Sequence, residues 1–236
     1  AVGFHSLLTN TTGTGSVAIG YNALDANTTG NYNTAVGQDA LSGNTTGTQN
    51  MGIGINAGIT ITTGSFNTAI GPNTLRGTAV TGSQNIAIGL QVLNLITSGG
   101  NNVSIGNYSS HKLTGGASNV ALGYAALNST TSADNNVAIG RDALLANTTA
   151  ANNVAVGALA LDANTTAAGN TAVGYNSLSA VQTNTGLTAV GYRALAVSNG
   201  GNNNTAVGYN AGVSISTGGQ NVMMGVNSLV SLTTGG

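Results

Sequence analysis

Hydrophobic and polar positions recur with a fixed period along the chain. A glycine preceded by an aliphatic residue returns every 17 residues, except for one step of 18 residues from Gly71 to Gly89. These glycines are Gly3, Gly20, Gly37, Gly54, Gly71, Gly89, Gly106, Gly123, Gly140, Gly157, Gly174, Gly191, Gly208 and Gly225. A unit of this length is too short for the two helices of a helical repeat. The sequence therefore predicts one coil of strands and turns per unit.

Aliphatic and small residues alternate just before each glycine. In the second unit, Val17 and Ile19 flank Ala18. Later units keep this spacing, with Thr in place of the first aliphatic residue in five of them, as at Thr34. This spacing favours a β-strand with one aliphatic side and one side of Ala, Gly or Ser. We infer that the aliphatic side fills the coil and that the small side meets another subunit, because a face without bulk permits close approach. A leucine four residues after the glycine, such as Leu24, is predicted to point inward.

Asparagine opens most of these strands. Asn33 and Asn170 are examples, and their amides are expected to pair with the neighbouring coil. We assign a structural role to both and to the repeated glycines. The extra residue of the longer unit falls between Arg76 and Ser83, where we expect it to bulge outward from the coil.

Composition leaves little room for charge-driven partners. The chain has four Lys and Arg, five Asp, no Glu and no Cys, and a formal net charge of −1. Only 4% of its residues are charged, compared with about 25% in an ordinary globular domain. We therefore expect no nucleic-acid partner. No apolar run approaches the roughly 20 residues that span a bilayer, so no membrane insertion is expected either.

Candidate catalytic groups do not converge. His5 and His111 lie about six units apart. Asp25 and Asp162 occupy equivalent positions in their units, so their recurrence reflects the repeat. We predict no catalytic residue, no metal site and no cofactor, and hence no enzyme.

Two sets of residues that recur in successive units could form binding surfaces, one aromatic and one polar. Tyr175, Tyr192 and Tyr209 each follow a repeated glycine in successive units, and we expect them to stack. They are candidate ligand contacts, for a sugar or for lateral packing in a fibre. Asn-Thr-Thr triplets suggest ice binding, but adjacent residues of an extended segment point to opposite faces and give no flat double row.

The strand unit resembles a known family. Asn33–Gly37 and Asn170–Gly174 both read Asn-Thr-Ala-Val-Gly, as in the head repeat of trimeric autotransporter adhesins. The resemblance implies a left-handed parallel β-roll wound as a homotrimer. The longer unit, from Asn170 to Leu178, looks more like repeats of phage tail fibres and related bacterial surface fibres.

The sequence thus predicts an all-β protein, a parallel β-solenoid of about 14 coils that forms a single repeat domain over residues 1–236. We expect this segment to belong to a longer fibre and to be the shaft of an extracellular, cell-surface or virion attachment fibre that presents a binding tip. Two alternatives stay open. One is a surface adhesin that binds a host receptor or glycan directly, and the other is an ice-binding solenoid.

Overall fold

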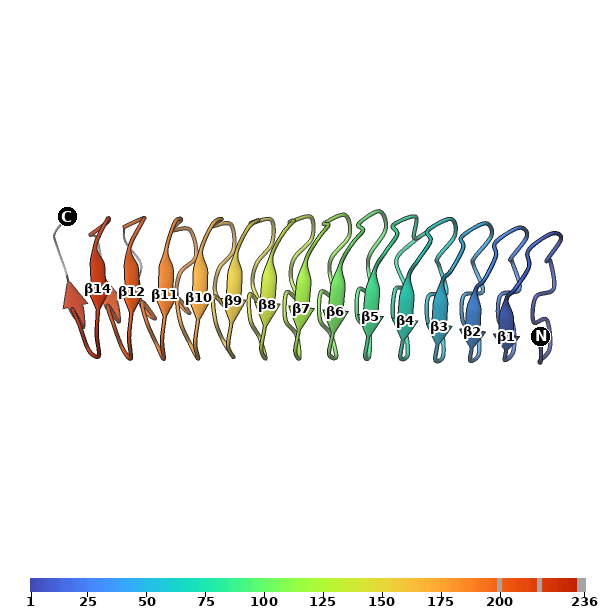
Figure 1. Cartoon of the computed structure of the whole chain (residues 1–236), viewed down its shortest axis with the longest axis horizontal. Coiled ribbons are helices and arrows are strands. Elements are labelled where there is room, and N and C mark those ends of the chain that lie inside the picture. Colours follow the sequence, from blue (N-terminus) through green and yellow to red (C-terminus); the bar gives the residue numbers. More distant parts are fainter. Residues whose placement is uncertain (199–200, 216–217, 233–236) are drawn as a thin grey trace. The chain divides into compact units, whose positions relative to one another are not determined.

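The computed structural model describes residues 1–198, 201–215 and 218–232. The chain forms two compact units, unit 1 (Ala1–Asn119) and unit 2 (Val120–Gly236). Both are built from the same coil, which has one short strand and a series of turns (Figure 1). The predicted all-β parallel solenoid with a 17-residue repeat is confirmed. Left-handed winding, the three-chain assembly and a single domain over 1–236 stay predictions.

Six strands form a parallel sheet in unit 1 and pair in chain order. The strand partners are residues 17 or 18 positions apart, as in the pair Ala18 and Ala35. Val2 adds an isolated parallel bridge to Ile19. The strands are β1 (Val17–Ile19), β2 (Thr34–Val36), β3 (Met51–Ile53), β4 (Thr68–Ile70), β5 (Ile86–Ile88) and β6 (Val103–Ile105).

Unit 2 continues the same pattern. Its main strands also pair in parallel and in chain order, and β13 (Ser214–Ile215) pairs separately with β15 (Ser231–Leu232). The main strands are β7 (Val120–Leu122), β8 (Val137–Ile139), β9 (Val154–Val156), β10 (Thr171–Val173), β11 (Thr188–Val190), β12 (Thr205–Val207) and β14 (Val222–Met224).

Peptide groups of the turns also pair between coils. The Leu24 amide donates to the Ala40 carbonyl at 3.1 Å, and the Thr28 amide donates to the Thr45 carbonyl at 2.9 Å. Each coil therefore supplies hydrogen-bond partners for the backbone of its neighbour over most of its circumference. This arrangement satisfies backbone groups that a short strand alone would leave unpaired.

The turn after each glycine uses left-handed backbone conformations. Asn176 has φ of 56° and Leu178 has φ of 51°, two and four residues after Gly174. Asparagine tolerates this region, whereas leucine there costs about 1–2 kcal/mol. The leucine is fully buried, and burial of such a side chain contributes about 1.5–3 kcal/mol. Packing therefore offsets the strain, and the predicted inward position of the leucine is confirmed.

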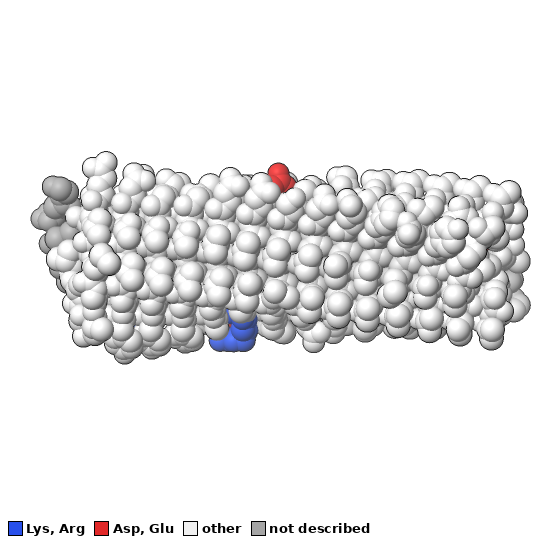
Figure 2. All heavy atoms as spheres, in the orientation of Figure 1, with Lys and Arg blue, Asp and Glu red and all other residues white. Residues whose placement is uncertain are grey.

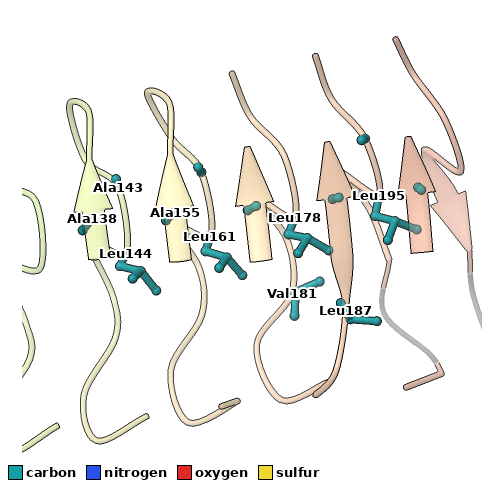
Figure 3. Packing of buried hydrophobic residues seen from close by; sticks show 14 of the residues in the cluster. Ala138, Ala143, Leu144, Ala155, Leu161, Leu178, Val181, Leu187 and Leu195 are labelled. Carbon is teal, nitrogen blue, oxygen red and sulfur yellow. The ribbon is translucent and has the colours of Figure 1, made fainter. Parts of the chain in front are cut away.

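The core of each coil consists of small and branched aliphatic side chains. In unit 2, Ala138 and Ala155 project from their strands toward Leu144 and Leu161, which come from the following turns (Figure 3). All four residues are completely buried. The same alanine and leucine positions form the core of unit 1. The leucine position supplies one large side chain in most coils, and some coils add a second buried aliphatic residue, as Ile96 does in the coil of Leu93.

Three coils lack the inward leucine, and each has a buried aliphatic residue three positions further along. The replaced position and its substitute are Gly58 and Ile61, Ser110 and Leu113, and Gly212 and Ile215. A buried aliphatic side chain from the next turn thus contributes to the interior where the leucine is absent, although Ile96 and Val181 occupy the same position in coils that keep it.

The longer unit bulges outward, as predicted. Thr78 and Ala79 are exposed, and Ala79 has φ of 106°. Val80 returns to the interior, is fully buried and bridges Ile61. Strand pairing between β4 and β5 continues without a shift of the core positions.

Candidate functional site

The two sides of each strand face in the opposite directions from those predicted. Ala18, Ala35 and the equivalent small residues point into the coil and are completely buried. Val17 and Ile19, expected inside, are instead 46% and 45% exposed. The expectation that the aliphatic side fills the coil and the small side meets another subunit is therefore wrong. In this fold the small side is the interior.

The reason is the width of the coil. Leucine from the turn already fills the interior, so the strand can add little more than a methyl group. At Gly52, even a Cβ would lie 2.8 Å from the Leu41 Cγ and 2.9 Å from the Ala57 carbonyl oxygen. The larger member of each alternating pair must therefore face outward, although hydrophobic residues are more often inside.

The outward side chains of these strands form what we call the aliphatic stripe of each unit. It consists of the first and third residues of β1–β6 in unit 1 and of β7–β12 and β14 in unit 2. All are half-buried or exposed, and they are Val, Ile, Leu, Met or Thr. None is charged, and charged groups are also sparse on the face drawn in Figure 2.

The repeated glycines hold neighbouring coils at close approach within the chain. Gly140 has φ of 134°, and a Cβ there would lie 2.6 Å from the carbonyl carbon and oxygen of Gly157. A residue with a side chain would meet both backbone strain and a clash. The structural role predicted for these glycines therefore rests on contact between coils and not on contact with another subunit.

Asparagine side chains form a buried ladder, as predicted. Asn33 Nδ2 donates to the Gly47 carbonyl at 2.8 Å, and its Oδ1 accepts from the Asn50 amide at 2.9 Å. Asn170 donates to the Asn184 carbonyl and accepts from the Leu187 amide in the same way. Each asparagine side chain thus links its own coil to the following coil at two points.

A second asparagine column was missed by sequence reasoning. It comprises the asparagines of the Asn-Thr-Thr triplets, which are buried except for Asn10. Asn44 Nδ2, for example, donates to Asn27 Oδ1 at 2.8 Å. In unit 2, Asn164 donates to Asn147 at 3.2 Å. The signal was available, because these positions alternate with Ile61, Val80 and Ile96 elsewhere in the repeat, and such an exchange indicates an interior site.

Threonines of the same triplets divide between two environments. The hydroxyl of Thr28 is half-buried and donates to the Thr45 carbonyl at 3.0 Å, and Thr148 donates likewise to Thr165. The next residue, Thr29, is exposed. The two threonines therefore do not present a double row on one surface.

Tyrosines on one edge of unit 2 stack as predicted. The ring centroids of Tyr175 and Tyr192 are 5.5 Å apart at an interplanar angle of 13°, and those of Tyr192 and Tyr209 are 5.0 Å apart at 9°. The three side chains are 42–50% exposed. Both faces of the Tyr192 ring lie against its neighbours, so the stack offers mainly ring edges and hydroxyls. A ligand contact here stays a prediction.

The two histidines, Asp25 and Asp162 lie in four different coils. Burial raises the pKa of Asp25 and of Asp162 above the ordinary value of 3.8. His5 stacks on Phe4, while His111 lies 3.1 Å from the Gln91 carbonyl oxygen through Nδ1. Over residues 1–198, 201–215 and 218–232 there is no pocket and no metal-binding cluster of His, Cys, Asp or Glu. That part of the chain also has no helix suited to crossing a membrane.

Comparison with known proteins gives no relative. No family model, no curated protein and no solved structure matches the chain. The surfaces described above and the resemblance of the repeat are therefore the features that indicate a function.

Proposed function

We propose that the chain is a structural segment of the shaft of an extracellular or virion attachment fibre, which presents a binding tip. Its copies associate with one another along the aliphatic stripe, as a homotrimer. The observation that carries this proposal is the stripe itself, because it repeats on every main strand of both units and has no charged member.

Energetics favour covering this surface. Removing a half-exposed Val or Ile from water contributes about 1 kcal/mol. With two outward side chains on each of six strands in unit 1, the gain is of order 10 kcal/mol. That value is similar to the roughly 4–15 kcal/mol that association costs in lost freedom. One coil could not offset this cost, but the partner buries a similar row, so the two rows together gain of order 20 kcal/mol.

Another copy of the chain is the occupant that fits best. Strands in a parallel sheet are spaced by about 4.8 Å, so the stripe presents the same contour at every step. A second stripe has the same spacing and can match it coil by coil. Because neither stripe is charged, two copies meet without like-charge repulsion. Two facing stripes would also exclude water, so burial of the stripe does not by itself distinguish a dimer from a trimer. We propose a trimer because the Asn-Thr-Ala-Val-Gly unit resembles the repeat of trimeric adhesins.

Native mass measurement of the full chain tests the proposal. Analytical ultracentrifugation over a range of concentrations should give a trimer. A stable monomer at high concentration would reject assembly through the stripe. A dimer would retain the interface but reject the adhesin-like arrangement, and electron microscopy of the assembly would show whether the copies lie side by side.

Two other functions have a specific observation in their favour. Thr171, Thr188 and Thr205 lie in register on the outward face of β10–β12, which suits an ice-binding surface. The exposed tyrosine stack suits a glycan-binding adhesin. Measurable thermal hysteresis would favour the first function, and specific binding on a glycan array would favour the second.

A further inference from the structure

The three stacked tyrosines are fixed by the backbone. β10, β11 and β12 pair in parallel with Val173, Val190 and Val207 in register, and each tyrosine follows two residues later. Beyond the strands, the Arg193 amide donates to the Tyr175 carbonyl at 2.9 Å, and the Asn210 amide donates to the Tyr192 carbonyl at 2.9 Å. The backbone therefore holds the three tyrosines one coil apart along the stack.

This arrangement suits one reaction of phenols. One-electron oxidation of two tyrosines gives phenoxyl radicals, which couple when the ring carbons beside the hydroxyls meet. The ring centroids are 5.0 and 5.5 Å apart and the planes nearly parallel, so neighbouring phenols are held side by side, while the exposed edges stay accessible to an oxidant. Holding two reactants together removes most of the entropic cost of a bimolecular step.

We propose that Tyr175, Tyr192 and Tyr209 form a site of oxidative tyrosine coupling, at which a haem peroxidase using hydrogen peroxide joins neighbouring rings and links successive coils covalently. Each of two phenols loses one electron and one proton. A carbon–carbon bond then forms between their ortho carbons, and each displaced ring hydrogen moves to its oxygen and restores the phenol. The peroxide accepts the two electrons and two protons and becomes two water molecules.

Tyr192 has a distinct position because it has a tyrosine on each side. It carries two ortho carbons, so it can couple to Tyr175, to Tyr209 or to both. Tyr21 provides the internal comparison. It is equally exposed and also stacked, with its ring centroid 5.6 Å from that of Phe4, but a phenylalanine ring has no phenol to oxidise. The proposal does not depend on the proposed shaft function.

The test treats the folded full chain with peroxidase and peroxide, then unfolds it and digests it with trypsin. Cleavage at Arg141 and Arg193 separates Tyr175 and Tyr192, in residues 142–193, from Tyr209, in residues 194–236. A Tyr192–Tyr209 bond therefore joins two peptides, and a Tyr175–Tyr192 bond removes two hydrogens within one peptide. We expect both products, at least tenfold more abundant from folded than from urea-unfolded chain.

Variants and isotope mixing make the result specific. Tyr192→Phe preserves the ring and should abolish both products, whereas Tyr21→Phe should leave their yield unchanged. A mixture of heavy-isotope-labelled and unlabelled chains should give joined peptides of matching label. Equal yields from folded and unfolded chain, persistence in Tyr192→Phe, or peptides of mixed label would each overturn coupling between coils of one chain.

Discussion

At the scale of single residues, the glycine of each repeat is the position with the least freedom. Gly140 combines a left-handed φ with a backbone neighbour that leaves no room for a Cβ. Its position could be recognised from periodicity alone. The reason for it could not, because the sequence does not reveal whether a close backbone belongs to the next coil or to another chain.

Replacing Gly140 by Ala should destabilise the coil by about 2–4 kcal/mol, since it adds backbone strain and overpacking. Thermal unfolding followed by circular dichroism measures this change. Gly115→Ala is the matched control, because its nearest neighbour, the Ser98 Oγ, would lie 3.6 Å from the new Cβ. The control should change stability by less than about 0.5 kcal/mol. Equal effects of both changes would contradict the role assigned to Gly140.

Asp162 should make stability depend on pH. Its folded-state pKa is raised by burial, and its Oδ1 is buried without a hydrogen-bond partner. The protonated form is thus favoured in the fold, so its contribution is present below pH 3.8 and is lost as pH rises through the raised value. Asp162→Asn should therefore raise the melting temperature at neutral pH and have little effect near about pH 3.

The reverse substitution gives the control for this pH dependence. Asn94 occupies the equivalent position after Gly89, and its Oδ1 is also buried and unpaired. Asn94→Asp should lower the melting temperature at neutral pH, and acidification should recover it. A loss that is the same at both pH values would show that shape, and not charge, determines the effect.

At the scale of the coil, the repeat predicted the elements better than their orientation. The strand, the inward leucine, the asparagine ladder and the outward bulge all followed from the spacing of residues. The side of the strand that faces inward did not, because Val17 and Ala18 are both apolar and alternation alone marks two faces without ranking them. Alanine lies inside because the interior is narrow and the inward leucine already fills most of it.

The coil that has Ser110 at the inward leucine position gives a further prediction. Leu113 fills the interior where Ser110 replaces the inward leucine, and Ser110 accepts a hydrogen bond from Ser104 at 2.8 Å. Leu113→Ala should therefore cost about 3–5 kcal/mol, because no other large side chain fills that coil. Val181→Ala, in a coil that retains Leu178, should cost less, about 1–2 kcal/mol. Chemical denaturation measures both free energies.

Restoring the leucine separates packing from other effects of the Leu113 change. The double variant Ser110→Leu with Leu113→Ala should recover much of the lost stability, because the usual position then fills the coil. Additive losses in the double variant would mean that the two positions do not share one space.

At the scale of the whole molecule, the reversal of the strand faces changes which surface can bind another copy. With alanine outside, an interface would have been close and nearly featureless. With Val, Ile and Thr outside, each strand instead presents two side chains that can interdigitate with a matching row. The candidate interface is therefore the aliphatic side of each three-residue strand and not the small side that was predicted. The sequence pattern identified these aliphatic residues correctly, but they were predicted to lie in the core.

Assembly through the stripe should make stability depend on protein concentration, since a partner that binds only the folded chain shifts unfolding by mass action. The melting temperature should therefore rise with concentration. Ile139→Lys puts a charge within the unit 2 stripe, on β8, where Ile139 is 36% exposed. It should abolish this dependence while the strand signal in circular dichroism persists. Thr149→Lys adds the same charge at an exposed turn outside the stripe and should leave the dependence intact. A melting temperature independent of concentration in the unchanged chain, with a monomeric mass, would remove the basis for assembly along the stripe. Loss of the dependence in both lysine variants would place the contact elsewhere or attribute it to net charge.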